Sequence, residues 1–324
     1  MNWQNIIGNS QAITHLKVLI AEGTMPHALL FVGPEGIGKF LTATITAAAL
    51  FCEGEQKPCG RCKACEQLLA QNHPDLFILE PDGQTIKIEQ VRTLQSNIAL
   101  APYMANQRVV IMDKADSMTP QSANSLLKTL EEPTGNVVFI LIAASRQKLL
   151  DTILSRCMVI DFKPIAREVL AEALVEREFE PAVAKVIARL AEGSFGKALR
   201  LLEQDGLQIR DRALRVLEQL GDCDMDVVWR ESSELSELDR TKLFEVLLDL
   251  NLLFRDILVM HSDESSELIY NIDVVAELGN QIEHWSVRKL IRAIGELANT
   301  QQRLKANVNA KLAVEQLLIK LRDL

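Results

Sequence analysis

The first half of the chain alternates between short apolar runs and longer segments with helical patterning. Five runs are continuous in apolar and β-branched residues, which is typical of strands buried on both faces of a parallel sheet. They cover residues 27–33, 75–80, 108–113, 137–144 and 158–162. Helix-length segments separate them, among them 40–51 and 120–132. This alternation predicts a mostly parallel α/β sheet with helices on both faces.

After Phe162 the pattern becomes helical. Lys163-Pro164 interrupts the chain, and three short helices are expected over 165–178, 181–191 and 195–203. Asp205-Gly206 marks a further boundary. The remaining third is helical to its end. Apolar residues stand at near-helical spacing in its last segment, at Leu304, Val308, Leu312, Leu317 and Leu321. An ordinary bundle and a partner-binding one both fit this third.

Composition narrows the class of protein. The 324 residues, 48% hydrophobic and 24% charged, indicate a globular chain of two or three domains. A net charge of −9 argues against a protein that coats nucleic acid by charge alone. There is no apolar run of about 18 residues to span a membrane, and residues 1–8 do not resemble a secretory signal. We therefore expect a cytoplasmic protein without a membrane partner.

A glycine-rich turn follows the first predicted strand and opens a helix. It reads Gly33-Pro-Glu-Gly36-Ile-Gly38-Lys39, a setting in which backbone amides cradle phosphates and a lysine reaches the terminal ones. The next position should carry Ser or Thr to ligate magnesium, but here it is Phe40. The turn therefore resembles a phosphate loop that has lost its metal ligand. An ordinary strand–helix turn without a nucleotide role is the alternative.

The acidic half of such a site is also incomplete. Asp113 ends the strand that begins at residue 108 and could hold magnesium. The following position, where a glutamate would activate water, is Lys114, and a cation cannot act as that base. Two separate losses affect the same chemistry, so we expect no hydrolysis. Nucleotide binding without turnover stays open, because the glycines and Lys39 are intact.

Four cysteines are crowded into a short segment. Cys52, Cys59, Cys62 and Cys65 have the spacing C-x6-C-x2-C-x2-C, with which four thiolates can surround one structural zinc ion. An iron–sulfur cluster is the main rival, although the usual C-x3-C-P continuation is absent. A cytosolic setting disfavours disulfides. His73 could be a further ligand, but a residue in a helix-to-strand turn is the simpler interpretation.

Three strings, together with the cysteine knuckle, carry a family resemblance. Ser125-Leu-Leu-Lys-Thr-Leu-Glu-Glu-Pro133 follows the Asp113 strand, Ser155-Arg156-Cys157 precedes the last strand, and Pro26-His-Ala-Leu-Leu-Phe31 forms the first. In this order they resemble the bacterial clamp-loader family of AAA+ proteins. The resemblance covers the first 205 residues well, and the last third only in length and helical character.

The resemblance implies a role for each departure from the family pattern. Its gamma and tau motor subunits keep an intact phosphate loop, an acidic pair and a lid arginine. This chain instead has Phe40, Lys114 and Gly196 there, and its strand-end sensor region reads Ala143-Ala-Ser145. All these departures resemble the delta-prime branch. Arg156 is retained, and in the family such an arginine reaches the ATP bound by a neighbouring subunit. A local salt bridge is the alternative role.

The resemblance also implies an organisation and a set of partners. It gives an AAA+ domain over 1–164 with a cysteine knuckle at 52–65, a three-helix lid over 165–205, and a helical collar over 206–324. The expected partners are gamma/tau and delta subunits in a heteropentamer. Through that complex the chain would meet the sliding clamp (beta) and primed DNA. The alternatives are an active gamma/tau-type motor, a free-standing AAA+ helicase, or a zinc-stapled adaptor outside replication.

Overall fold

The computed structural model describes residues 2–133, 135–203, 206–220, 223–262, 266–306 and 308–324. The chain divides into two compact units. The first comprises Met1–Ala173 with Glu192–Lys197, and the second comprises Leu174–Ala191 with Ala198–Leu324. The division into three domains at residues 164 and 205 stays a prediction.

All five predicted strands are present and pair in parallel within one sheet of the first unit. They are β1 (Ala28–Val32), β2 (Leu76–Leu79), β3 (Arg108–Met112), β4 (Val137–Ala143) and β5 (Met158–Asp161). Their order in the sheet is β2-β3-β4-β1-β5. The expected parallel α/β sheet is confirmed.

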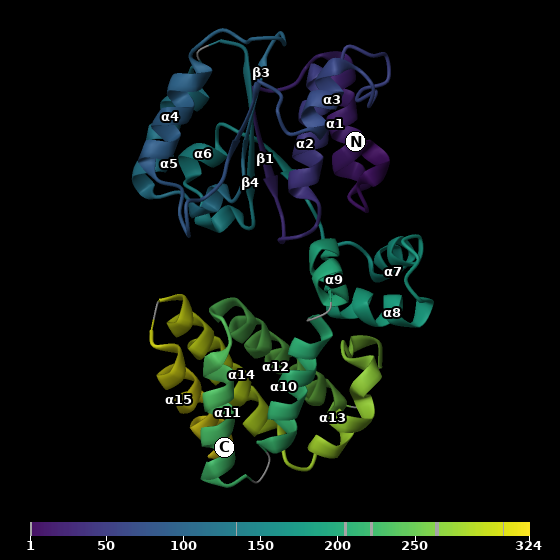
Figure 1. The fold of residues 1–324 in the computed structure, drawn as a ribbon, viewed down its shortest axis with the longest axis vertical. Helices are drawn as coiled ribbons and strands as arrows, with labels where there is room; N and C mark the ends of the chain where they lie inside the picture. Colours follow the sequence, from purple (N-terminus) through teal and green to yellow (C-terminus); the bar gives the residue numbers. More distant parts are fainter. Residues whose placement is uncertain (1, 134, 204–205, 221–222, 263–265, 307) are drawn as a thin grey trace. The chain divides into compact units, whose positions relative to one another are not determined.

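Helices cover both faces of this sheet (Figure 1). One face carries α1 (Ser10–Glu22), α2 (Lys39–Phe51) and α3 (Lys63–Leu69), and the other carries α4 (Ile88–Ile98), α5 (Pro120–Glu131) and α6 (Asp151–Leu154). Leu29 and Phe31 of β1 lie in the first core, whereas Leu30 lies in the second. A strand buried on both faces has no polar alternation, which explains the continuous apolar runs of the sequence.

A buried carboxylate fixes the loop between α4 and β3. Asp75 has no exposed surface, and its oxygens accept hydrogen bonds from three consecutive backbone N–H groups, those of Tyr103, Met104 and Ala105, at 2.7–2.9 Å. Arg108 Nε lies 3.8 Å from Asp75 Oδ1. The loop presents Tyr103 to solvent with 81% of its surface exposed. The bonds to Asp75 therefore fix the backbone of the loop, while the side chain of Tyr103 remains exposed.

Three short helices follow the sheet, as predicted. They are α7 (Arg167–Val175), α8 (Pro181–Leu190) and α9 (Phe195–Leu202). Pro181 occupies the first turn of α8, and Gly193, with φ of +78°, lies between α8 and α9. Of the expected boundary at Asp205-Gly206, Asp205 lies outside the described residues, and Gly206 begins the next helix.

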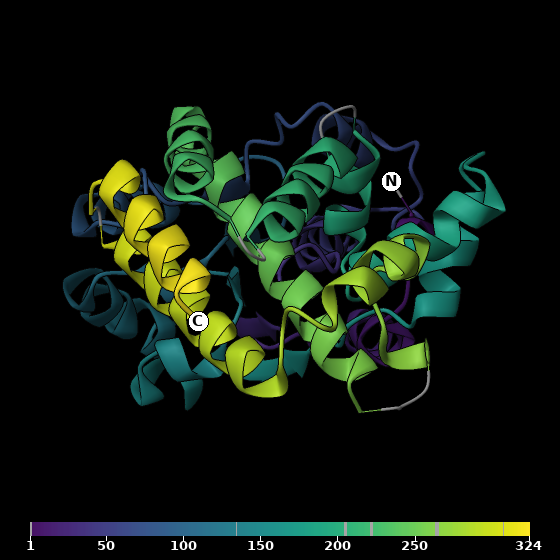
Figure 2. The same cartoon turned by 90° about the horizontal axis from the view of Figure 1, so that it is seen from below.

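The second unit has a helical core of its own. Its further helices are α10 (Gly206–Gln219), α11 (Met225–Glu237), α12 (Arg240–Met260), α13 (Val275–Gln281), α14 (Val287–Lys305) and α15 (Ala310–Arg322). In Figure 2, α14 and α15 lie side by side in yellow. The apolar spacing near the end therefore spans two helices, and Leu312 is 61% exposed, whereas Leu317 and Leu321 are buried.

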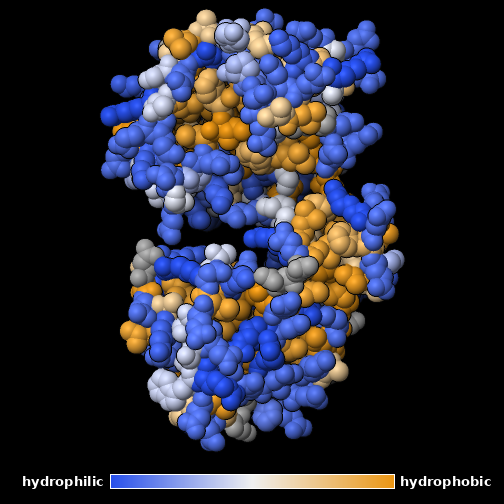
Figure 3. Space-filling model, viewed as in Figure 1, coloured by the Kyte–Doolittle hydropathy of each residue, from blue (hydrophilic) through white to orange (hydrophobic). Residues whose placement is uncertain are grey.

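The surface agrees with the composition. On the face drawn in Figure 3, hydrophilic side chains dominate and hydrophobic ones form smaller patches. Among the described residues, the helices are too short or too polar for any of them to cross a membrane.

Candidate functional site

The phosphate loop lies where β1 ends and α2 begins, at the carboxyl edge of the sheet. Gly33, Gly36 and Gly38 all have positive φ angles, and Gly38 caps the start of α2. At Gly33 a Cβ would lie 2.2 Å from the carbonyl oxygen of Phe162, so only glycine fits beside β5 there. The three glycines of the loop therefore adopt φ angles that other residues rarely adopt.

The ammonium group of Lys39 is turned back into this loop. Its Nζ donates to the carbonyl oxygens of Gly33 and Pro34, both at 2.5 Å, and only 6% of the residue is exposed. Burial lowers the pKa of Lys39 below its usual value, although the nearby carboxylates of Glu35, Asp113 and Asp116 act in the opposite direction.

The segment before and within the start of α9 covers the rest of the loop. Ser194 Oγ donates to the carbonyl oxygen of Glu35 at 2.9 Å. The backbone N–H of Gly196 donates to the carbonyl oxygen of Gly36 at 2.8 Å. Together with the two carbonyls bound by Lys39, four consecutive loop carbonyls therefore accept an internal donor. Gly196 has no side chain, and a Cβ there would lie 3.0 Å from Gly36 Cα, so glycine permits this close approach.

The two substituted positions lie in the first turn of α2 and just after β3. Phe40 lies in the first turn of α2 with 36% of its surface exposed, and a phenyl ring offers no oxygen to a magnesium ion. Asp113 follows β3, and Lys114 is exposed with φ of +48°. Ser145, beyond β4, accepts a hydrogen bond from the Gln147 N–H with its Oγ. Among these positions, Asp113 alone offers a carboxylate.

Arg156 lies between α6 and β5 and is anchored within its own chain. Its Nη1 donates to the Thr152 carbonyl at 2.8 Å and to Ser155 Oγ at 3.2 Å, and its Nη2 donates to Glu131 Oε1. The Arg156 side chain keeps 32% of its surface exposed. The local salt bridge that the sequence left open does form.

Arg156 and the phosphate loop lie at opposite edges of the sheet. The loop follows Val32 at the carboxyl end of β1, whereas Arg156 precedes Met158 at the amino end of β5. These two strands are parallel neighbours, with Val32 opposite Asp161. From Met158 to Asp161, β5 alone spans about 10 Å. Arg156 is therefore not part of this chain's own phosphate site.

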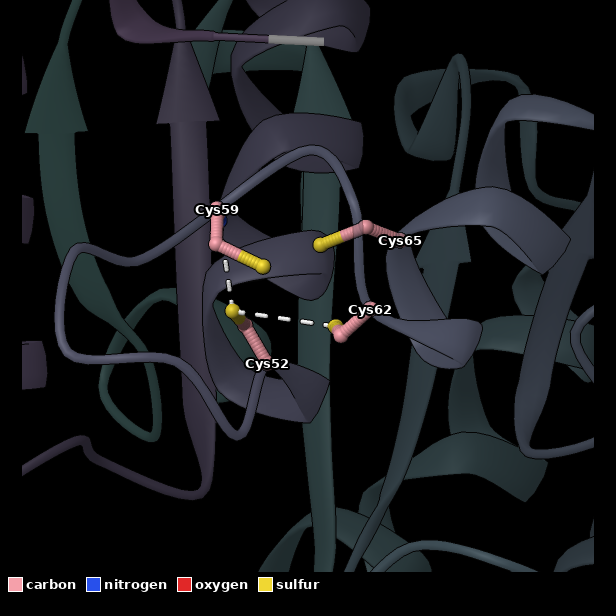
Figure 4. Close-up of side chains that lie close together, drawn as sticks. All are labelled: Cys52, Cys59, Cys62 and Cys65. Carbon is pink, nitrogen blue, oxygen red and sulfur yellow. Dashed lines mark hydrogen bonds between the residues drawn. The ribbon is translucent and has the colours of Figure 1, made fainter.

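The four cysteines converge on one point, as Figure 4 shows. Their sulfur atoms all lie within 4.8 Å of one another, and Cys62 Sγ is 3.9 Å from Cys52 Sγ. The backbone N–H groups of Gly54 and Cys59 donate to Cys52 Sγ. Trp3 Nε1 donates to the Lys57 carbonyl at 2.8 Å and ties this segment to the amino terminus. The cluster could hold a metal ion.

The thiols of the cluster differ in acidity. Burial raises the pKa of Cys65 to about 12 and also raises the pKa of Cys52. In contrast, hydrogen bonds from the backbone N–H groups of Arg61 and Cys62 lower the pKa of Cys59 to about 6. A cation at the centre would favour the thiolate form of all four, since metal binding releases their protons.

His73 is not brought into the cluster. Its ring stacks on Phe51 with a centroid distance of 4.1 Å, and its Nδ1 accepts the N–H of Asp75 at 3.2 Å. Burial lowers the pKa of His73, although Asp75 opposes the shift. The interpretation of His73 as a turn residue before β2 is confirmed.

Two contacts of the candidate sites were not expected from the sequence. One is the partner in the salt bridge that the sequence left open for Arg156: it is Glu131, which belongs to another of the strings that carry the family resemblance. The other is the hydrogen bond of Ser194 to the phosphate loop, across 159 positions of sequence. The sequence held one signal for the first contact: Glu131 lies near the end of the string 125–133, and Arg156 is the cation of the string 155–157.

Comparison with known proteins agrees with these features. The family model described as DNA polymerase III, delta subunit, matches residues 8–166, and the model of its C-terminal part matches residues 204–323. The DNA polymerase III subunit delta' of Bacillus subtilis (strain 168) is 31% identical over 310 residues, covering 94% of this chain and 93% of that protein.

Further similarities lie among tau and gamma subunits. The DNA polymerase III subunit tau of Escherichia coli (strain K12) is 35% identical over 208 residues, which is 62% of this chain and 32% of that protein. The solved structure of a DNA polymerase III gamma subunit-related protein from Thermotoga maritima has a TM-score of 0.45 at 18% identity, covering 95% and 98% of the two chains. With both parts of the delta model matched and a delta' relative aligned over nearly its whole length, the chain belongs to the DNA polymerase III delta/delta-prime family of clamp-loader subunits.

Proposed function

We propose that this chain is a catalytically silent subunit of a bacterial replicative clamp loader and lends Arg156 to the ATP site of a neighbouring subunit. The position of Arg156 carries this proposal. The residue is partly exposed at the sheet edge opposite to the chain's own phosphate loop, so a phosphate that it serves belongs to another chain. A planar guanidinium there would offset the charge of the phosphoryl group during its transfer.

The silence of the chain's own site is supported by four features. Phe40 cannot ligate magnesium, and Lys114 cannot act as a general base. Lys39 is bound to two loop carbonyls, which its ammonium has to leave before it can reach a phosphate. Gly196, at the position where the resemblance places a lid arginine, offers no cation to a phosphate. We therefore expect the isolated chain not to hydrolyse ATP.

Family membership supports the partners. In this proposal the chain joins gamma/tau and delta subunits in a cytoplasmic ring of five, which loads the sliding clamp (beta) onto primed DNA. A chain with a net charge of −9 is a poor binder of DNA on its own, so the ring as a whole would hold the DNA. The helical region 206–324 is the proposed collar through which the subunits join.

The cysteine cluster is the proposed site of a structural zinc ion. Zinc–sulfur bonds of about 2.3 Å in a tetrahedron place neighbouring sulfur atoms about 3.8 Å apart. The 3.9 Å between Cys62 Sγ and Cys52 Sγ fits this geometry. With four thiolates in place the ion has no open position, so its contribution would be to fold the segment 52–65.

The proposal is tested by ATP turnover of the reconstituted loader with clamp and primed DNA. Arg156→Ala should remove the activity of one neighbouring site, where an arginine finger is worth about 10³-fold or more in rate. Arg156→Lys should recover little, because an ammonium lacks the planar pair of donors. The isolated chain should show no turnover.

Other results would favour the other functions. Magnesium-dependent hydrolysis by the isolated chain would favour the gamma/tau-type motor, despite Phe40 and Lys114. If turnover by the loader is the same with Arg156→Ala, the finger role is wrong. If the chain does not associate with delta or gamma/tau subunits at all, a zinc-stapled adaptor outside replication becomes the better account.

A further inference from the structure

The ion pair between Arg156 and Glu131 joins the two strings that carry the family resemblance. Glu131 is the last residue of α5, and Arg156 follows α6, so the contact bridges two elements 25 positions apart. The two side chains are 32% and 47% exposed. A pair this open to solvent contributes little to folding, typically under about 1 kcal/mol. We therefore look for the effect of this ion pair in the position of the Arg156 guanidinium, rather than in the stability of the fold.

The contacts divide the guanidinium into a held part and a free part. Nη1 has two partners, the Thr152 carbonyl and Ser155 Oγ, both from the adjacent turn of chain. Nε is buried and has no hydrogen-bond partner among the described residues. Nη2 carries two N–H bonds, of which Glu131 Oε1 accepts one. Apart from the buried Nε, the free N–H is thus on Nη2, and the bond to Glu131 restrains the direction in which it lies.

We propose that Glu131 is a positioning residue for Arg156, which it holds ready for the phosphate of a nucleotide bound by the neighbouring subunit. This inference rests on the proposed function. A free arginine side chain loses about 2 kcal/mol of rotamer freedom when it is ordered. Two anchors from different elements remove that freedom before the phosphate arrives. Preorganised donors of this kind are what stabilise charge that develops during a reaction.

The hydrogen-bond acceptor at position 131, more than its charge, performs this role. Two substitutions separate the two properties. Glu131→Gln keeps an oxygen that accepts from Nη2 but removes the charge, whereas Glu131→Ala removes both. Glu132 provides a matched control, because it is the next residue, exposed and of equal charge, and no ion pair to Arg156 is formed by it among the described contacts.

The experiment measures kcat and KM for ATP in the complete loader with clamp and primed DNA. Glu131→Ala should lower the part of kcat that Arg156→Ala removes roughly five- to tenfold, with little change in KM, since misplaced catalytic groups cost rate rather than nucleotide affinity. Glu131→Gln and Glu132→Ala should stay within about twofold of the wild-type protein. In an Arg156→Ala background, Glu131→Ala should have no further effect, because the side chain that it positions is gone.

The possible failures are distinguishable. If Arg156→Ala leaves turnover unchanged, the proposed function fails and the positioning role fails with it. If Arg156→Ala abolishes the neighbouring site's turnover but Glu131→Ala does not lower kcat, the finger stands and the positioning role is overturned. A rise in kcat with both Glu131→Ala and Glu131→Gln would mean that the carboxylate restrains Arg156. An equal loss with Glu132→Ala, or a loss of assembly or thermal stability in Glu131→Ala that Glu131→Gln shares, would mean a general role of the helix end and would also overturn the proposal.

Discussion

At the scale of single residues, Asp75 is a fully buried carboxylate that backbone N–H groups bind on both oxygens. Burial alone would raise the pKa of this carboxyl, but the N–H groups of Ala105, Tyr103 and Met104, together with His73, outweigh burial and hold the pKa below its usual value. The ionised form is thus favoured by the folded state. Its hydrogen bonds fix the loop that leads into β3, next to Arg108.

Asp75→Asn should lower the free energy of unfolding at pH 7 by about 1–3 kcal/mol, because an amide leaves buried N–H groups without an acceptor. The depressed pKa gives a stabilising contribution that is complete above about pH 4 and is lost as the pH falls through the folded-state value. The difference between the wild-type and variant proteins should therefore narrow in acid. Urea unfolding at pH 7 and pH 3 checks this, and a difference that is constant or widens in acid would contradict it.

At the scale of elements, the sequence predicted what depends on local pattern. The five strands were predictable because strands buried on both faces are continuously apolar, and α8 was predictable from Pro181 in its first turn. The cysteines were predictable as a cluster because their spacing is short. The contact of Ser194 with the phosphate loop was not, because it depends on how α9 is placed on the sheet. Leu312 was not either, since near-helical spacing does not reveal that one helix ends and another begins.

The contact between residues 194–196 and the phosphate loop can be tested with two glycines that have nearly the same φ angle. Gly36 and Gly83 have φ angles of +73° and +72°, but a Cβ at Gly36 would lie 2.3 Å from Ser194 Oγ, whereas a Cβ at Gly83 meets nothing within 4 Å. Gly83→Ala should cost about 1 kcal/mol for the left-handed conformation alone. Gly36→Ala should cost about 1–2 kcal/mol more, because Ser194 must move and its hydrogen bond is lost. If denaturant unfolding gives the same loss of stability for Gly36→Ala and Gly83→Ala, residues 194–196 do not press on the phosphate loop.

The metal site is also a matter of elements, because Cys52 ends α2 and Cys65 lies in α3. The purified protein should contain about one zinc ion per chain, and Cys65→Ser should lose it. Cys157→Ser is the matched control and should keep it, since Cys157 lies outside the cluster. Chelation should lower the melting temperature of the wild-type protein, because binding free energy contributes to folding. Iron and sulfide in the protein, or no metal at all, would contradict the assignment.

At the scale of the whole molecule, the phosphate loop and Arg156 lie at opposite ends of the parallel strands. The carboxyl edge holds a phosphate loop whose four carbonyls are satisfied by Lys39, Ser194 and Gly196. The amino edge holds Arg156, anchored by Glu131 and partly exposed. The sequence indicated a silent site through Phe40 and Lys114, and it indicated a role for the retained Arg156. It could not give their placement, which follows from the order of the parallel strands. A silent site and an active arginine can therefore coexist in one chain.

The most direct test of this account compares Lys39→Met with Arg156→Ala in the same reconstituted loader, by clamp- and DNA-stimulated ATP turnover. Each variant is first shown to assemble and to unfold at a temperature close to that of the wild-type protein. The account predicts that Lys39→Met turns over ATP as the wild-type loader does, whereas Arg156→Ala loses the activity of one neighbouring site. The opposite result, a large loss with Lys39→Met and none with Arg156→Ala, would mean that this chain hydrolyses its own ATP and would contradict the central claim.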